Sequence, residues 1–252
     1  MPDSAESDLH HVKPFVYETP NVKALHFSIS EVQSRMQVRH PDALDLEYTR
    51  TMMGFLLFHP APRHLTMIGL GGGSLAKFCH RHLPRTHIRA VEINPHVIAL
   101  RDSFQVPPDG PRFEVVRGDG ARLVREAAVP CDVLLVDGYD SSGLPSRLGM
   151  ARFYDDCHDA LEPGGVLVVN LHSGHHRFDI LVDRMRRSFD DSVLLVDASD
   201  RSNTIVFAFK DRDLADLRRG ALRPPQGLDG VAFKQLRADF AAVVTALAAQ
   251  DR

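Results

Sequence analysis

The chain has 252 residues, of which 44% are hydrophobic, so it can form one large domain with appendages around a sizeable core. Its net charge of −3, from 30 basic and 33 acidic residues, provides no positive field that would attract nucleic acid or an anionic membrane. No stretch reaches the length of a transmembrane helix, and the polar N-terminal segment lacks the apolar core of a signal peptide. We therefore expect a soluble, cytoplasmic protein that has neither nucleic acid nor membrane as a partner.

The three cysteines, Cys79, Cys131 and Cys157, are widely separated and match no metal-binding or redox spacing. Their neighbours are apolar or typical of helices. This pattern predicts buried free thiols in a reducing compartment.

The N-terminal quarter predicts a lead-in, a small sheet and a helix. Residues 1–13 lack an apolar period and are expected to be disordered, whereas residues 14–43 alternate in short β-like segments at 15–17, 23–29 and 32–38. We predict an antiparallel β-hairpin region there. Residues 44–59 then predict a helix, whose apolar face consists of Leu44, Tyr48, Met52, Phe55 and Leu56.

Strand and helix patterns alternate after residue 60, as a parallel sheet requires. Strands are predicted at 65–70, 88–92, 112–116, 132–137, 164–170, 191–196 and 204–209, and helices at 74–82, 95–103, 119–127, 148–161 and 176–188. The segment 162–165 is expected to stop a helix and turn into the fifth strand. Because no helix separates the last two strands, they predict an antiparallel hairpin at the sheet edge.

These patterns define an α/β fold with a mostly parallel, seven-stranded sheet. We assign residues 44–211 to a Rossmann-like nucleoside-binding domain and residues 212–252 to a C-terminal helical extension. The extension contains predicted helices at 213–219 and 231–249.

A glycine-rich turn follows the first strand of this domain. The apolar run 65–70 leads into Gly71, Gly72 and Gly73 and then into a helix-compatible segment. Glycines let the backbone turn sharply and let a ligand approach its N–H groups. Glu92 ends the next strand, where a carboxylate can bind both hydroxyls of a ribose. The turn, the spacing and the acid together favour a nucleoside site over a turn that serves packing alone.

Further acids end the third and fourth strands of the predicted parallel sheet. Asp119 can accept a hydrogen bond from an adenine amino group or cap the following helix, and the two roles are compatible. Asp137 and Asp140 form a carboxylate pair that can attract a cationic substrate, and one of them can take a proton from an amine. Turn chemistry alone could explain Asp140. It does not explain Asp137, because a charge that ends a buried strand is costly without a partner.

Two other side chains on this rim are candidates. Tyr139 lies between the two acids and either closes over the substrate or packs on the sheet, and His172 is placed to line the acceptor side. His172, His175 and His176 together suggest a metal cluster, but no further ligand is spaced to complete one. A polar loop is the preferred interpretation, and we expect no metal.

These motifs resemble those of the spermidine synthase (polyamine aminopropyltransferase) family. The resemblance covers roughly residues 15–210 and rests on Gly69–Ser74, Glu92, Gly118–Gly120, Asp137 with Asp140 and Gly143, Phe153–Tyr154 and Leu161–Gly165. It implies a fold of the class I S-adenosylmethionine-methyltransferase type with an N-terminal β-hairpin domain, and frequent dimers. It also implies decarboxylated S-adenosylmethionine as donor and a primary amine as acceptor, so we expect a homodimer that takes a small-molecule amine.

The resemblance assigns a role to each matching residue. Glu92 would hold the ribose, Asp119 the adenine, Asp137 would be the base, and Asp140 would bind the amine. The donor site would further include the following residues: Gly69, Gly71, Gly72 and Gly120 from the main domain, and Gln33 as the match to a hairpin glutamine.

The sequence departs from the family pattern at four places. Gly72 stands where the family has an aspartate that holds the amino group of the donor, and Arg50 stands where it has a glutamate, in a triplet after Tyr48 and Thr49. Ser141 replaces a proline, and the chain has no tryptophan. Our hypothesis is an aminopropyltransferase. The alternatives are a methyltransferase that uses intact S-adenosylmethionine, and a non-catalytic nucleoside-binding protein.

Overall fold

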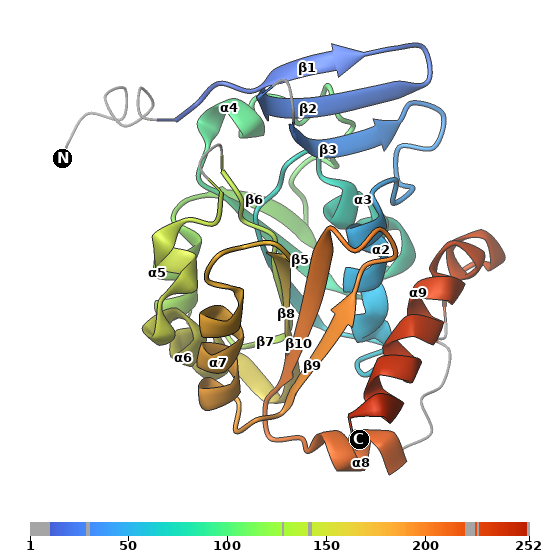
Figure 1. Cartoon of the computed structure of the whole chain (residues 1–252). Helices are drawn as coiled ribbons and strands as arrows, with labels where there is room; N and C mark the ends of the chain where they lie inside the picture. Colours follow the sequence, from blue (N-terminus) through green and yellow to red (C-terminus); the bar gives the residue numbers. More distant parts are fainter. Residues whose placement is uncertain are drawn as a thin grey trace.

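The computed structural model describes residues 11–28, 31–127, 129–140, 143–219, 225 and 227–250. The predicted lead-in falls mostly outside these residues. The chain forms a three-stranded antiparallel sheet, β1-β2-β3, above one rim of a seven-stranded sheet with the order β6-β5-β4-β7-β8-β10-β9 (Figure 1). The small sheet consists of β1 (Phe15–Glu18), β2 (Val22–Ser28) and β3 (Glu31–Gln37).

The strands of the large sheet are β4 (His64–Ile68), β5 (His87–Glu92), β6 (Phe113–Arg117), β7 (Cys131–Val136), β8 (Leu161–His172), β9 (Val193–Asp197) and β10 (Asn203–Phe209). Strands β4 to β8 run parallel, and β10 is antiparallel to both β8 and β9. The predicted fold class, the N-terminal antiparallel strands and the final edge hairpin are therefore confirmed.

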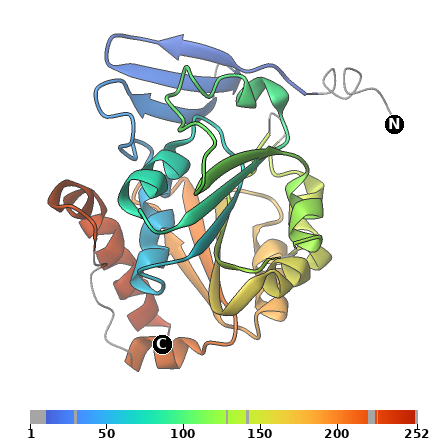
Figure 2. The same cartoon turned by 180° about the vertical axis from the view of Figure 1, so that it is seen from behind.

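Helices cover both faces of the large sheet (Figures 1 and 2). The α-helices are α2 (Glu47–Met52), α3 (Ser74–His82), α4 (Pro95–Ile98), α5 (Gly120–Arg125), α6 (Ala151–Asp159), α7 (Phe178–Ser188), α8 (Leu214–Arg219) and α9 (Gly230–Ala249). The part of the chain that the structure describes also contains the 3₁₀ helices η1 (Met53–Leu57) and η2 (Ser146–Gly149). Helices α5, α6 and α7 lie on one face, and α2, α3 and α9 lie on the other.

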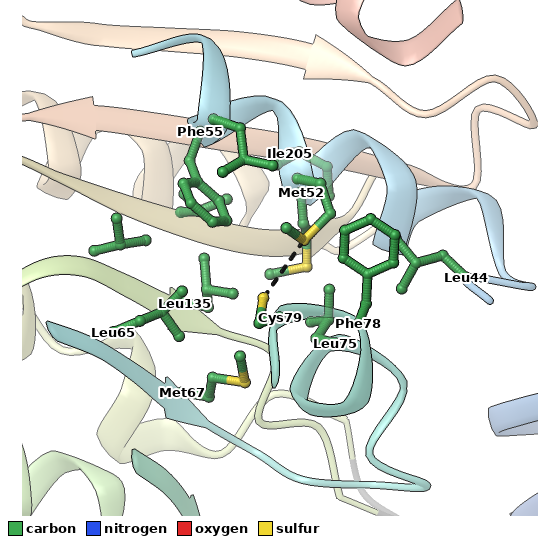
Figure 3. Close-up of a cluster of buried hydrophobic side chains, with 14 of the residues drawn as sticks. Leu44, Met52, Phe55, Leu65, Met67, Leu75, Phe78, Cys79, Leu135 and Ile205 are labelled. Carbon is green, nitrogen blue, oxygen red and sulfur yellow. Dashed lines mark hydrogen bonds between the residues drawn. The ribbon is translucent and has the colours of Figure 1, made fainter. Parts of the chain in front are cut away.

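The central strands have continuous apolar sequences because helices cover both of their faces. In β7, Val133 and Leu135 pack into the core beneath α2, α3 and α9, whereas Leu134 and Val136 pack beneath α5, α6 and α7. Figure 3 shows the first of these cores, in which side chains of the two strands β4 and β7 meet those of α2 and α3. Each fully buried aliphatic side chain contributes about 1.5–3 kcal/mol of transfer free energy.

Cys79, Cys131 and Cys157 are all free and buried, as the sequence predicts. Cys79 lies 3.9 Å from the sulfur of Met53. Burial raises the pKa of all three thiols, and that of Cys131 reaches about 12. They therefore act as small apolar core residues.

Several predicted boundaries were wrong. The helix predicted over 44–59 changes from α to 3₁₀ at Met53, because Gly54 has weak helix propensity and packs so closely that an added Cβ would lie 2.8 Å from Val243. The helix predicted over 95–103 is α-helical only to Ile98. It continues as turns in which Leu100 N–H donates to Val97 O and Arg101 N–H to Ile98 O, so these bonds span three residues.

The segment 162–165 belongs to β8 and is not the predicted helix stop and turn. Backbone hydrogen bonds of 3.0 Å join Gly164 N to Lys210 O and Lys210 N to Gly165 O, so the strand pairing extends through the glycines. The register of β10 therefore overrides the local turn preference of this segment.

The C-terminal helix α9 shares the main core. Leu236, Phe240, Val243 and Leu247 are buried, as the apolar face of the predicted helix requires. Thr51 of α2 also donates a hydrogen bond of 2.9 Å to the buried Asp239 of α9. Among the described residues, no helix combines the length and hydropathy needed to span a membrane.

Candidate active site

The carboxyl ends of the parallel strands open into a cavity of about 1090 Å³, roofed by residues of β2 and β3. The sheet order sets the sequence of groups along this rim. Asp119 follows β6, Glu92 ends β5, the glycine turn follows β4, Asp137 follows β7 and His172 ends β8. Every residue that the sequence analysis predicted to contact ligand lines the cavity, except Gly72.

Only glycine fits at Gly69, the first position of the glycine turn. Gly69 has a φ of +96°, and a Cβ added there would lie 2.1 Å from the backbone oxygen of Asp137. Gly71 and Gly73 also have positive φ, at +52° and +69°. A Cβ on Gly120 would lie 2.5 Å from Ile68. These glycines let β4, β7 and the start of α5 approach one another closely beneath the cavity.

Gly72 packs under the roof of the cavity. A Cβ at this position would lie 2.7 Å from the hydroxyl of Ser34 and 2.8 Å from the buried ring of Phe104. The family pattern has an aspartate here, and Ser34 and Phe104 occupy the space that its side chain would need. The predicted contact between Gly72 and the donor remains a prediction.

Glu92 braces the glycine turn from the next strand. Its side chain is buried and accepts hydrogen bonds from the backbone N–H groups of Leu70, at 3.0 Å, and Asn94, at 2.8 Å. Burial raises the pKa of this carboxyl, and the backbone N–H groups oppose that rise. Four backbone N–H groups, those of Leu70, Gly71, Ile93 and Asn94, interact with this carboxylate, and its contact with a ribose remains a prediction.

Asp119 is the N-cap of α5, which confirms one of its two proposed roles. Its Oδ1 accepts a hydrogen bond of 2.9 Å from the backbone N–H of Ala121. Its Oδ2 lies 2.6 Å from Nη1 of Arg147, a residue that is 72% exposed. The adenine contact of Asp119 remains a prediction.

Asp137 lies at the middle of the rim and is held from two sides. The hydroxyl of Tyr48 donates to its Oδ2 and the amide of Asn170 donates to its Oδ1, both at 2.9 Å. The amide of Asn203 in turn donates to the oxygen of Asn170 at 2.8 Å. Burial raises the pKa of Asp137, while the hydrogen bonds from Asn170 and Tyr48 lower it. The carboxylate is thus oriented and kept more basic than an exposed aspartate.

The sequence places Asn170 at the end of a predicted strand on this rim without giving it a role, and it does not single out Asn203. The signal for Asn170 was present, because a polar residue directly follows the apolar segment 166–169 at the rim. Asn203 could not be recognised in the same way, since its position depends on β10 inserting between β8 and β9. Tyr48 was predicted to lie on the apolar face of a helix and was noted as the matching member of a family triplet, without a role at Asp137.

Tyr139 packs on the sheet, which was one of its two predicted arrangements. Its hydroxyl accepts a hydrogen bond of 3.0 Å from the backbone N–H of His172, and the two ring centroids lie 4.4 Å apart. Asp140 is exposed, and its backbone pairs with Gly143 through hydrogen bonds of 3.0 and 3.1 Å. Ser141 lies outside the described residues.

Arg50, the cation in place of the family's glutamate, is directed away from the rim. Its Nη1 donates to the backbone oxygen of Leu44 at 3.1 Å, and its Nε lies 3.6 Å from Asp239 of α9. Its Nη2 lies 3.7 Å from Glu47. The positive charge is therefore shared between two carboxylates, so it does not oppose a cationic ligand in the cavity.

The fold and the rim together define a class of protein, the Rossmann-like α/β proteins with a cavity at the carboxyl edge of the sheet. A family model described as the spermine/spermidine synthase domain matches residues 45–182. The chain is 39% identical over 222 residues to a polyamine aminopropyltransferase of Neisseria meningitidis serogroup A, which covers 85% of this chain and 84% of that protein. It therefore belongs to the spermidine synthase (polyamine aminopropyltransferase) family, as the sequence motifs predicted.

Two further comparisons agree with this assignment. The chain is 40% identical over 196 residues to a polyamine aminopropyltransferase of Chromobacterium violaceum, covering 77% of this chain and 75% of that one. The crystal structure of a probable spermidine synthase from Corynebacterium glutamicum superimposes with a TM-score of 0.67 at 20% identity and covers 91% of both chains. The latter similarity establishes the fold.

Proposed function

We propose that this protein transfers an aminopropyl group from decarboxylated S-adenosylmethionine to a primary amine. The membership of the chain in the aminopropyltransferase family supports the donor and the amine class of acceptor. The adenosyl group would lie along the β6-β5-β4 side of the rim, with its ribose at Glu92 and its adenine near Asp119. Its reactive carbon would then face Asp137 at the centre.

In this mechanism Asp137 is the general base. The acceptor enters as an ammonium ion, and the carboxylate takes one of its protons. The free amine attacks the carbon next to the sulfonium, the carbon–sulfur bond breaks, and its electron pair neutralises the sulfur. The products are the extended amine and methylthioadenosine. Tyr48 and Asn170 hold the base in place, so much of the acceleration comes from the position of the reactants.

One observation carries this proposal. Asp137 is a carboxylate whose two oxygens are each fixed by a side-chain donor at 2.9 Å, in a cavity that also contains Glu92. Burial raises the pKa of this acid, so it accepts a proton more readily than an exposed aspartate, and the two donors hold it in position to do so.

The test is release of methylthioadenosine by the purified protein from decarboxylated S-adenosylmethionine with a panel of di- and triamines. We expect turnover with at least one linear amine. Asp137→Asn should reduce kcat by about 10²–10⁴-fold, the usual contribution of general-base catalysis. An asparagine can still accept from Asn170 and donate to the oxygen of Tyr48, so binding of methylthioadenosine should persist.

The Asp137→Asn variant should also be at least as heat-stable as the wild type. The pKa of Asp137 is raised in the folded state, so its contribution to stability decreases as pH rises above the unfolded value. At neutral pH the buried charge of Asp137 therefore lowers the free energy of unfolding, and the uncharged asparagine avoids this cost. A wild-type protein that binds the nucleoside but releases no methylthioadenosine with any amine would contradict the proposal.

Methyl transfer is the second candidate, and Gly72 is the observation that favours it. The position offers no carboxylate for the amino group of a decarboxylated donor, and its surroundings leave no room for one. Parallel assays with intact S-adenosylmethionine distinguish the two reactions, because methyl transfer yields S-adenosylhomocysteine and no methylthioadenosine.

A further inference from the structure

Asp137 lies at one end of a chain of side-chain hydrogen bonds that starts in the turn before β10. The hydroxyl of Ser202 donates to Oδ1 of Asn203 at 2.8 Å, and the amide of Asn203 donates to Oδ1 of Asn170 at 2.8 Å. The amide of Asn170 then donates to Asp137 at 2.9 Å. Strand β10 is therefore connected to the proposed base through a single intervening side chain.

The register of the strands brings the two asparagines together. Asn203, the first residue of β10, is opposite His172 of β8, and Ile205 is opposite Asn170. Side chains two residues apart on a strand point to the same face, so Asn203 and Asn170 are diagonal neighbours on one face of the sheet. This is the face that α2 covers, since Ile205 packs in the core beneath that helix.

Both amides are removed from water and held in place. Asn170 is 3% exposed and Asn203 is 6% exposed. A buried polar group without a partner is costly, so each amide has to keep its hydrogen bonds. The backbone oxygen of Asn203 also accepts a hydrogen bond of 2.8 Å from the backbone N–H of Ala198. The β9–β10 hairpin thus fixes the position of the Asn203 side chain.

The direction of the hydrogen bonds follows from the charge at the end of the chain. An ionised carboxylate only accepts hydrogen bonds, so Asn170 has to turn its N–H₂ group toward Asp137 and its oxygen toward Asn203. Asn203 then has to offer its own N–H₂ group, while its oxygen accepts from Ser202. A side chain at position 203 that only accepts would draw the N–H₂ group of Asn170 away from Asp137.

The other titratable groups that face Asp137 come from three elements. Tyr48 of α2 donates to its second oxygen at 2.9 Å, His172 at the end of β8 favours the charged carboxylate, and Tyr139 lies in the loop after β7. The same cavity is also lined by Glu47, Glu92, Asp140, Asp200 and the ion pair of Asp119 with Arg147. A substitution at position 203 leaves all of these groups in the protein.

We propose that Asn203 is a positioning residue, which fixes the amide of Asn170 with its N–H₂ group toward Asp137 and so keeps the base free to accept the proton of the amine. This inference rests on the proposed function and adds a residue of β10 to the groups that control the base. Burial raises the pKa of Asp137, and the hydrogen bond from Asn170 opposes that rise most strongly. A change that weakens or turns this amide should therefore raise the pKa of Asp137 further.

The experiment measures the pKa of Asp137 by NMR titration of protein that is isotopically labelled at the aspartate carboxyl carbons, with Asp137→Asn to identify the signal. Asn203→Asp keeps the shape of the side chain and replaces its donor by an acceptor, and Asn203→Leu removes both functions. Asn170→Leu removes the intervening amide. Thr204→Val is the matched control, because this buried neighbour in β10 loses a hydrogen bond of 2.8 Å to Asp197 on the opposite face of the sheet.

We expect Asn203→Asp and Asn170→Leu each to raise the pKa of Asp137 by about 1–2 pH units, the equivalent of a lost hydrogen bond to a charged group. Asn203→Leu should raise it by less, because the donor that polarises the amide of Asn170 is lost while the amide itself remains. Thr204→Val should leave it unchanged. An unchanged pKa in both variants at position 203 would overturn the inference.

The double variant separates the amide from the added charge. In the Asn170→Leu background, Asn203→Asp should raise the pKa of Asp137 no further, because the side chain that transmits the effect is absent. A charge that acts through space would raise the pKa equally in both backgrounds, and this result would also overturn the inference.

The same variants are assayed for release of methylthioadenosine across the pH range. The acid limb of the kcat/KM profile should move to higher pH together with the pKa from NMR, so below both limbs Asn203→Asp should be about 10–100-fold slower than the wild type. A loss that is equal at every pH would show a merely structural role and contradict the inference. Absence of turnover in the wild type would refute the proposed function, while the NMR titration would still decide whether Asn203 controls Asp137.

Discussion

Replacing Gly69 by alanine tests whether the glycine turn sets the position of the base. The added Cβ would lie 2.1 Å from the backbone oxygen of Asp137, whereas real Cβ atoms essentially never come within 3.0 Å of such an atom. The ends of β4 and β7 must therefore move apart by about 0.9 Å at this point, which is the difference between those two distances. The φ of +96° adds backbone strain, because an alanine rarely adopts it.

The cost follows from these two effects. A strained φ costs about 1–3 kcal/mol, and the forced separation of packed backbone adds about 1–3 kcal/mol. A total of about 4 kcal/mol, the middle of the summed range, corresponds to a fall in Tm of about 8–16 °C for a chain of this size. A displacement of about 1 Å at a reacting group can also reduce kcat by roughly 10²-fold.

Thermal denaturation and the methylthioadenosine assay measure both quantities. Gly110→Ala is the matched control, because nothing lies within 4 Å of a Cβ at Gly110 and its φ is not positive. It should leave both Tm and kcat unchanged. A Gly69→Ala protein with the Tm and kcat of the wild type would refute the argument that this turn fixes Asp137.

Three other variants test separate parts of the site. Tyr48→Phe removes a hydrogen bond that lowers the pKa of Asp137, so this pKa should rise. The acid limb of the pH profile of kcat/KM should then move to higher pH. An unmoved limb would count against Asp137 as the base. Glu92→Gln places an amide N–H₂ group against a backbone N–H that the carboxylate accepts from. Calorimetry should show methylthioadenosine binding about 10–100-fold more weakly. Equal affinity would show that Glu92 does not bind the nucleoside. Gly72→Asp should lower Tm without improving use of the decarboxylated donor, because Phe104 fills the space; a gain in activity would show that this space can open.

The fold was predictable from the sequence because its signals are local and repeat. Apolar strands alternate with amphipathic helices over most of the chain, and the glycine turn marks the first crossover. Boundaries failed where tertiary contacts override propensity. Gly54 is drawn into close packing with α9, and the glycines before Val166 are held in β8 by their pairing with Lys210.

The candidate site was only partly predictable, for a related reason. Residues that end or directly follow a strand, such as Glu92 and Asp137, were found because the rim of a parallel sheet collects them. Asn203 and Asp200 come from an antiparallel hairpin, whose place in the sheet no local pattern encodes. The direction of Arg50 was equally hidden, since it depends on an acid of α9 that lies far away in the sequence.

The contact between α2 and α9 has a practical consequence for handling this protein. Asp239 on α9 accepts a hydrogen bond from the hydroxyl of Thr51 and forms an ion pair with Arg50. Arg50 also contacts Glu47, the residue before Tyr48. A truncation or fusion that detaches α9 would expose the apolar side of α2 to water. The first turn of α2, which carries Tyr48, would then lose its contacts with Asp239. Loss of activity in such a shortened form would thus report a loosened catalytic helix, although no residue of α9 lines the cleft.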